Sequence, residues 1–255
     1  MEIMGILNLT PDSFSDGGTA TNPASAEEKL HSLAKYSDII DIGAESTRPN
    51  YPPVPVAEEL RRLDYLEQLV KACPKPISLD TQKATVAEYG ARCGVKIIND
   101  IWGLQGTQGD IAAVVSKYKL KVIIMHNQNG TEYRDILQDM TAFFQKSLEI
   151  AHNHGITQNQ IYLDIGLGFG KTAEQNFFVL KNLAYFKEQF ALPVVVAASR
   201  KSFLTKRDST IDRDNATDTV TAFAYQHGAD IVRVHDALRA RDVIKTLDAI
   251  TGASE

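Results

Sequence analysis

The chain has 255 residues, of which 44% are hydrophobic and 23% are charged. This composition excludes an intrinsically disordered chain, because enough apolar side chains are present to form a substantial core. The formal net charge of −5, with no long block of Lys or Arg, argues against a nucleic-acid-binding protein, which needs clustered basic residues.

The sequence also argues against a membrane protein and a secreted one. No apolar run approaches the roughly 18 to 20 residues that a membrane-spanning helix needs. The start of the chain lacks the basic flank and the length of a signal peptide, so we expect a cytoplasmic protein. Cys73 and Cys93 have no companion histidine at zinc-binding spacing, and they predict neither a disulfide framework nor a zinc site.

Eight short apolar runs recur along the chain and predict β-strands. They are rich in Ile and Val and do not alternate cleanly with polar residues, which is typical of strands buried on both faces of a parallel sheet. In chain order the runs are Ile3–Leu7, Ile39–Ile42, Pro76–Leu79, Val95–Ile98, Lys121–Met125, Ile161–Leu163, Pro193–Ala198 and Ile231–Val234.

Stretches with helical spacing lie between these runs. The clearest is the stretch from Val56 to Val70, where leucines form one apolar stripe and Glu58, Glu59, Arg61 and Arg62 fall largely opposite. The other predicted helices are Ala26–Tyr36, Lys83–Arg92, Gly109–Tyr118, Ile136–His152, Asn176–Phe190, Thr217–Gln226 and Leu238–Ile250.

The regular alternation of strand and helix predicts the fold. Eight strands and eight helical segments in a chain of this length match a (β/α)₈ TIM barrel. A doubly wound open sheet is the alternative. No linker-like stretch divides the chain, so we expect one α/β domain over residues 1–255.

The loop after the first run reads NLTPDSFSDGG, from Asn8 to Gly18. Its proline, glycines and two carboxylates, Asp12 and Asp16, form a turn-forming composition that also carries functional groups. An ordinary exposed turn is the simpler interpretation of this stretch alone.

Polar residues stand at the end of every predicted strand. Solvent exposure and helix N-caps explain some of them. In a (β/α)₈ barrel, however, the strand ends surround the active site, and amides and carboxylates followed by cations suit a flat polar heterocycle that carries an anion. The residues are Asn8, Asp41, Asp80, Asn99 with Asp100, His126, Asp164, Ser199 to Lys201, and Arg233 with His235.

The glycine-rich stretch DIGLGFGKT, from Asp164 to Thr172, is not a nucleotide-binding motif. A phosphate-binding loop would need glycine at Ile165, and a dinucleotide-binding fingerprint would need glycine at Lys171. The glycines instead suit close approach of the backbone to a ligand beside Asp164, with Phe169 as an apolar wall. A plain flexible loop is the alternative.

The stretch AASRKSF, from Ala197 to Phe203, follows the seventh run. It places two hydroxyls, two cations and backbone N–H groups at a strand-to-helix junction, which predicts an anion site. A capped helix with solvated Arg200 and Lys201 is the alternative.

Taken together, these segments closely resemble the dihydropteroate synthase family. The resemblance spans nearly the whole chain and is most specific where NLTPDSFSDGG, ESTRP and SRKS occur together. The matching segments are MGILNLTPDSFSDGG, IDIGAESTRP, ISLDT, IINDIWGL, Met125 with His126, LDIGLGFGK, SRKSF and RVHD.

The resemblance implies an activity. Members of this family condense 6-hydroxymethyl-7,8-dihydropterin diphosphate with p-aminobenzoate and release pyrophosphate with the help of Mg²⁺. It therefore implies a transferase of folate biosynthesis that binds small-molecule substrates, works by an S_N1-like displacement and forms a homodimer. The chain offers no catalytic serine or cysteine motif, and this displacement needs none.

The resemblance also implies roles for individual residues. The implied catalytic residues are Lys201, Arg233 and His235. The pterin slot comprises Asp80, Asn99, Asp164 and Lys201, with Arg233 stacked on the ring. The diphosphate contacts are Thr47, Arg233 and His235, and Arg48 is a further substrate-binding residue. Asn8 is implied at the magnesium, while Phe14, Pro49, Phe169 and Ser202 are implied around the aminobenzoate, with the first loop folding over that pocket.

Three positions depart from the family pattern. Ala197 replaces a glycine, Ile165 replaces a proline, and Ala216 with Thr217 replaces a Gly-Thr pair. Two other functions stay open on the sequence. One is a pterin-dependent methyltransferase domain on the same kind of barrel, and the other is a pterin-binding paralogue that has lost catalysis.

Overall fold

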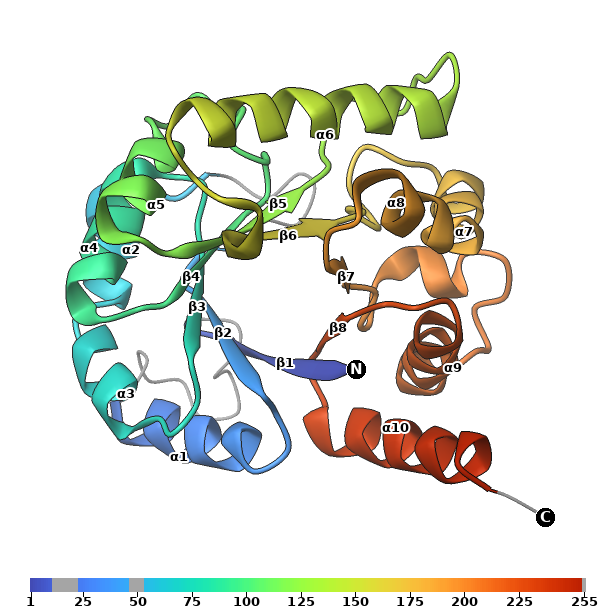
Figure 1. Cartoon of the computed structure of the whole chain (residues 1–255). Helices are drawn as coiled ribbons and strands as arrows, with labels where there is room; N and C mark the ends of the chain where they lie inside the picture. The colour runs from blue at the N-terminus through green and yellow to red at the C-terminus, as the bar shows by residue number, and fades with distance from the viewer. Residues whose placement is uncertain (11–22, 46–52, 254–255) are drawn as a thin grey trace.

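The computed structural model describes residues 1–10, 23–45 and 53–253 (Figure 1). Its eight strands are all parallel, pair in chain order and close into one barrel, because β8 pairs with β1. The predicted (β/α)₈ barrel is confirmed, and the open sheet is excluded. The strands are β1 (Glu2–Asn8), β2 (Ile39–Gly43), β3 (Ile77–Asp80), β4 (Ile97–Asp100), β5 (Lys121–Met125), β6 (Ile161–Asp164), β7 (Val194–Val196) and β8 (Ile231–Val234).

Helices surround the barrel (Figure 1). They are α1 (Pro23–Ala34), α2 (Val56–Arg62), α3 (Leu66–Ala72), α4 (Ala84–Cys93), α5 (Ile111–Tyr118), α6 (Ile136–Asn153), α7 (Ala173–Lys181), α8 (Leu183–Phe190), α9 (Arg213–Gln226) and α10 (Ala237–Thr251), with short 3₁₀ turns η2 (Gln158–Gln160) and η3 (Ser202–Thr205). Several begin at an N-cap that the sequence encodes. Thr172, for example, accepts the N–H of Gln175 at 3.2 Å and forms a capping box at the start of α7.

Two stretches that the sequence predicts as single helices each form two helices, so the prediction of one helix is wrong for both. The stretch from Val56 to Val70 divides into α2 and α3, and the stretch from Asn176 to Phe190 divides into α7 and α8 at Asn182. Leu63, between α2 and α3, is fully buried, so the apolar stripe continues across the break. The periodicity therefore could not reveal it.

The floor of the barrel is a layer of apolar side chains. One buried cluster contains one residue from each strand except β3: Met4, Ile39, Ile97, Ile123, Tyr162, Val195 and Ile231. Because side chains alternate between the two faces of a strand, these residues share the inner face, and a larger cluster packs the outer face against the helices.

The inner face changes character two residues further along the strands. Ile39 is followed at this spacing by Asp41, Ile97 by Asn99, and Tyr162 by Asp164, while Ile231 is followed by Arg233. On these strands the barrel interior therefore changes from an apolar floor to a polar level at the carboxyl ends.

Candidate active site

Strand register places four strand-end residues in one continuous row of paired neighbours. Asn8 pairs with Gly43, Gly43 pairs with Asp80, and Asp80 pairs with Asn99. Gly43 leaves room between its neighbours, since a Cβ at this position would lie 3.5 Å from Asp80 Cβ and 3.6 Å from Asn8 Oδ1. Residues from β1, β3 and β4 that are far apart in sequence thus meet at the mouth of the barrel.

Arg233 is held between two aspartates. Its Nε donates to Asp41 Oδ2 at 2.6 Å, and its Nη2 donates to Asp80 Oδ2 at 2.8 Å. Asn99 Nδ2 donates to the same Asp41 oxygen at 3.1 Å. A guanidinium with two carboxylates on its donors is fixed in orientation, as charge-assisted pairs of this kind are strong and directional.

Three oxygens of this cluster lack a partner within the described part of the chain: Asp41 Oδ1, Asp80 Oδ1 and Asn99 Oδ1. Buried polar atoms are nearly always hydrogen-bonded in folded proteins. Burial raises the pKa of the Asp80 carboxyl above its ordinary value, and the Arg233 guanidinium opposes that rise. The three oxygens therefore indicate a polar ligand that supplies N–H donors.

Asp164 and Lys201 form the opposite part of the site. Asp164 Oδ1 accepts the N–H of Gly166 at 2.7 Å, and burial raises the pKa of this carboxyl, while Lys201 opposes the rise. Lys201 Nζ donates to the carbonyl of Leu167 and lies 4.6 Å from the centre of the Phe169 ring. Burial lowers the pKa of Lys201 to about 8.

His235 is oriented by Ser199. The Ser199 hydroxyl accepts the backbone N–H of His235 at 3.1 Å and lies 2.9 Å from His235 Nδ1. In this arrangement the hydroxyl can donate its own proton to Nδ1, and a neutral ring then carries its proton on Nε2.

The segment after β7 turns sharply. Arg200 adopts a positive φ of 57°, its N–H is accepted by Thr217 at 3.1 Å, and its guanidinium pairs with Asp214 at 2.6 Å. Ser202 is exposed at the start of η3. Arg200 therefore binds α9, which leaves Lys201 as the cation of this segment that lies in the site.

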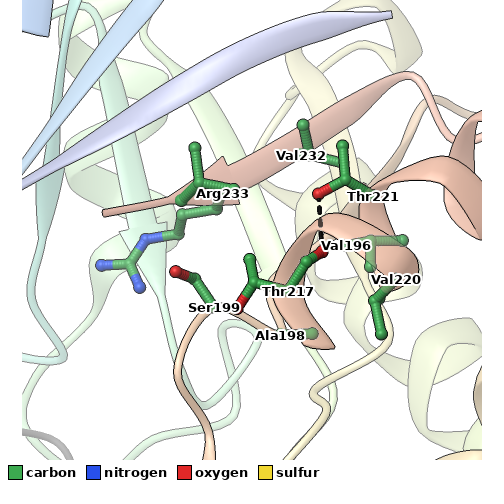
Figure 2. Close-up of a pocket in the computed structure, with 9 residues that line it drawn as sticks. Val196, Ala198, Ser199, Thr217, Val220, Thr221, Val232 and Arg233 are labelled. Carbon is green, nitrogen blue, oxygen red and sulfur yellow. Dashed lines mark hydrogen bonds between the residues drawn. The ribbon is translucent and has the colours of Figure 1, made fainter. Parts of the chain in front are cut away.

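Figure 2 shows the junction of β7, β8 and α9 beside Arg233. A cavity of about 10 Å³ lies there, with Ser199, Thr217 and Val220 in its lining. It has room for one water molecule at most. The Arg233 side chain extends away from it, so this cavity is a packing defect next to the site and not the substrate pocket.

A magnesium site made by protein carboxylates or histidines is not present in the described ranges, where no group of three or more His, Cys, Asp or Glu residues could hold a metal ion. The Asn8 amide at the mouth still suits Mg²⁺, which takes oxygen ligands, keeps several waters and commonly binds through substrate phosphates. The residues present therefore fit a metal that the substrate helps to bind.

Some predicted site residues lie outside the described residues: Phe14, Thr47, Arg48 and Pro49, with Asp12, Asp16 and most of the first loop. Glu45 is the last described residue before residues 46–52, and both of its carboxylate oxygens have a hydrogen-bond partner. Glu45 Oε1 accepts the N–H of Val54 at 2.7 Å, and Glu45 Oε2 accepts from Lys83 Nζ at 2.8 Å.

Three buried residues of the site have no role that the sequence predicts. Asp41 and His126 stand at strand ends without an implied role, and Lys171 belongs to the glycine-rich stretch. Asp41 could have been assigned from its place two residues after an inner apolar residue, because Asn99, Asp164 and Arg233 share that spacing. The contact between Lys171 and His126 joins the loop after β6 to the residue that follows β5, and no sequence signal predicts it.

No helix in the described part of the chain has the length and apolar character to cross a membrane.

Comparisons with known proteins indicate one family. A family model described as pterin binding enzyme matches residues 4–235. The dihydropteroate synthase of Clostridium beijerinckii is 39% identical over 253 residues, which cover 97% of this chain and 93% of that protein. The crystal structure of dihydropteroate synthase from Clostridium difficile in the presence of pteroic acid has a TM-score of 0.92 and 41% identity, and the match covers 98% of this chain and 96% of that one. The Xanthomonas albilineans enzyme with 4-aminobenzoic acid has a TM-score of 0.93 and 33% identity, with 99% and 94% covered.

Proposed function

This chain belongs to the pterin binding enzyme family and to its dihydropteroate synthases, and from that premise we propose how its site carries out the reaction. The enzyme is a transferase of folate biosynthesis. It joins 6-hydroxymethyl-7,8-dihydropterin diphosphate to p-aminobenzoate, which yields 7,8-dihydropteroate and pyrophosphate.

The observation that carries the proposal is the set of unpaired buried oxygens around Arg233. Asp80 and Asn99 offer acceptors to the N–H groups along the edge of the pterin ring. Asp164 adds a carboxylate from β6, and Lys201 adds a donor for ring acceptors. Arg233, fixed by Asp41 and Asp80, presents its planar guanidinium to the face of the ring.

The diphosphate lies toward β8 in this proposal. Arg233 and His235 come from the same strand end, and when the Ser199 hydroxyl donates to Nδ1 the His235 Nε2–H is the ring's donor for the diphosphate. Thr47 and Arg48 are proposed to complete the diphosphate contacts. Asn8 would hold Mg²⁺, which, when bound, neutralises charge on the leaving diphosphate.

The reaction then follows from charge stabilisation. The C–O bond to the diphosphate breaks and its electron pair leaves with the phosphate oxygen, while the pterin delocalises the positive charge on its methylene carbon. The amine of p-aminobenzoate attacks that carbon, forms the C–N bond and loses a proton. Phe169 and Ser202 are proposed to border the aminobenzoate, and Phe169 helps to exclude water, which would otherwise capture the cation.

Two further features belong to the proposal. We propose a homodimer, which sedimentation would report as a solution mass near twice 28.1 kDa. A cytoplasmic location agrees with a role in folate biosynthesis and with the features of the sequence.

The experiment that tests the function is pyrophosphate release by the purified protein with pterin diphosphate and Mg²⁺, with and without p-aminobenzoate. Formation of dihydropteroate that requires both substrates is the expected result. Pterin binding without product would contradict the proposal and indicate the non-catalytic paralogue, and transfer of a methyl group from a pterin would indicate the methyltransferase.

A further inference from the structure

The loop between β6 and α7 is held by a buried lysine that the reaction outlined above does not use. Lys171 Nζ donates to the carbonyls of Gly166 at 3.0 Å and Phe169 at 3.1 Å, and it lies 2.9 Å from Nδ1 of His126. Three acceptors match the three N–H bonds of the ammonium form of Lys171. Burial lowers the pKa of this lysine to about 7, and the Asp164 carboxylate opposes that change. The side chain is 8% exposed, so these contacts are made with little competition from water.

His126 is suited to be the third acceptor. Burial and, to a lesser degree, the charge on Lys171 lower its pKa to about 2, so the ring is neutral and Nδ1 can accept. The ring packs against Phe143, with centroids 4.8 Å apart, which fixes its orientation. Lys171 therefore joins the end of β5 to the loop that follows β6.

The loop needs such support because of its backbone conformation. Gly166, Gly168 and Gly170 have positive φ values of 63°, 84° and 53°. With three such residues in five positions the loop forms no helix or strand. Its one internal backbone hydrogen bond in the described structure runs from the Phe169 N–H to the Gly166 carbonyl at 3.2 Å, so most of its polar partners are side chains. At Gly166 the fit is close, since a Cβ there would lie 1.9 Å from the carbonyl oxygen of His126.

Other side chains complete this support. The Gly170 carbonyl accepts from Tyr133 Oη at 2.8 Å, and Asn176 Oδ1 accepts the N–H of Gly168 at 2.6 Å. The Leu167 carbonyl accepts from Lys201. The two lysines thus bind neighbouring carbonyls of one loop.

The same loop carries two parts of the proposed site. Its Leu167 carbonyl holds the amine of Lys201, and the Phe169 ring lies against that amine. Lys171 donates to the residue before Leu167 and to Phe169 itself. Any movement of the loop away from His126 would therefore displace both groups together.

We propose that Lys171 is a positioning residue of the synthase reaction: through the Gly166 and Phe169 carbonyls it fixes where the Phe169 ring faces the aminobenzoate and where the Lys201 amine faces the pterin. The inference rests on the function proposed above. Lys171 does not touch substrate; it acts through the loop. Asp80, Asn99 and Arg233 lie on strands that Lys171 does not contact, so the pterin retains most of its binding groups without it.

The test is Lys171→Met, which keeps the length and apolar stem of the side chain and removes its donors. Displacements of about 1 Å can cost a reaction about a hundredfold, so we expect the KM for p-aminobenzoate to rise about tenfold or more and kcat to fall. Affinity for 6-hydroxymethylpterin, measured by calorimetry, should fall by a smaller factor than the KM for p-aminobenzoate rises, because Asp80, Asn99 and Arg233 still bind the ring. Lys181→Met, at an exposed position on α7, is the matched control and should behave as the wild type.

Two results would overturn the inference. One is wild-type kinetics in the Lys171→Met variant. The other is a lower kcat with unchanged KM values, which reports only a smaller fraction of folded enzyme. If the variant does not fold, Tyr133→Phe removes a single bond to the same loop, and a rise in the KM for p-aminobenzoate is again expected, whereas an unchanged KM would overturn the inference. A wild-type protein that makes no dihydropteroate would instead overturn the proposed function, which keeps the two failures distinct.

Discussion

Arg233 donates from Nε to Oδ2 of Asp41 at 2.6 Å, and this ion pair ties β8 to β2 across the intervening β1. Asp41 is completely buried, and its second oxygen has no partner in the described part of the chain. The orientation of the guanidinium therefore depends on a carboxylate that itself offers a further acceptor to the site.

Asp41→Asn is expected to weaken pterin binding by about tenfold or more, because the charge-assisted bond that orients Arg233 becomes a weaker neutral one. Calorimetry with 6-hydroxymethylpterin measures the effect. Glu67→Gln, which breaks an exposed pair with Lys71, is the control and should leave affinity unchanged. Full pterin affinity in Asp41→Asn would show that Arg233 is oriented without this carboxylate.

Asp164→Asn is expected to reduce pterin affinity by about ten- to a hundredfold. The amide oxygen can still accept the Gly166 N–H, but the charged acceptor for the ring edge is lost, which is worth about 1.5 to 3 kcal/mol. Titration of the purified variant with the pterin measures this loss. Near-normal binding would remove Asp164 from the proposed ring-edge contacts.

Pterin affinity is expected to rise and then fall as the pH increases. Burial raises the pKa of Asp80 to about 7, so affinity should rise with pH as this carboxyl ionises and can accept ring N–H groups. Burial lowers the pKa of Lys201 to about 8, so affinity should fall again once this donor is deprotonated. Calorimetry between pH 5.5 and 9, a range chosen to cross both values, tests this. A pterin affinity that does not change with pH would contradict this prediction. The Lys201→Met variant should lose only the fall in affinity at high pH.

Lys83→Met is expected to destabilise the fold by about 3 to 5 kcal/mol, because it leaves two buried carboxylates unpaired. Lys83 Nζ lies 2.8 Å from Glu45 and 2.6 Å from Glu59, and all three side chains are 5% exposed or less. Urea unfolding measures the loss.

The loss in Lys83→Met should also depend on pH. Burial already raises the pKa of Glu59, and removal of the lysine raises it further. A carboxyl whose folded pKa exceeds its unfolded value favours folding at low pH and opposes it as pH rises. The deficit should therefore be smaller at pH 5 than at pH 7.5. Lys71→Met, on the surface, should show neither effect; equal deficits at both pH values would contradict the explanation.

Asn8→Ala is expected to raise the concentration of Mg²⁺ needed for half-maximal pyrophosphate release, because one oxygen ligand is removed. Binding of 6-hydroxymethylpterin, which carries no diphosphate, should not change. Chelation of divalent ions should stop turnover of the wild-type enzyme. An unaltered Mg²⁺ requirement in the variant would exclude Asn8 as a ligand.

Much of the fold could be predicted because it depends on local pattern. The runs at Lys121–Met125 and Ile231–Val234 match β5 and β8 in full, since buried parallel strands are apolar along most of their length. The division of α7 from α8 at Asn182 could not be predicted, because buried residues continue on both sides of it, from Leu180 to Leu183.

The candidate site was less predictable than the fold. Asp80, Asn99 and Arg233 could be placed together because strand ends of a barrel converge. The contact of Lys171 with His126 depends on how the glycines of the β6–α7 loop bend, and that is a tertiary property. Thr47 and Arg48 stay predictions, since they lie outside the described residues.

The apolar layer that closes the barrel below the site has a consequence for the order in which the two substrates bind. Asp80 and Asn99 lie on strands just above the apolar layer, whereas Phe169 and Ser202 lie on segments after the strands, nearer to solvent. A pterin that reaches the strand residues must therefore enter before the aromatic amine covers it. The enzyme should follow a compulsory order in which the pterin diphosphate binds first, and p-aminobenzoate alone should bind only weakly.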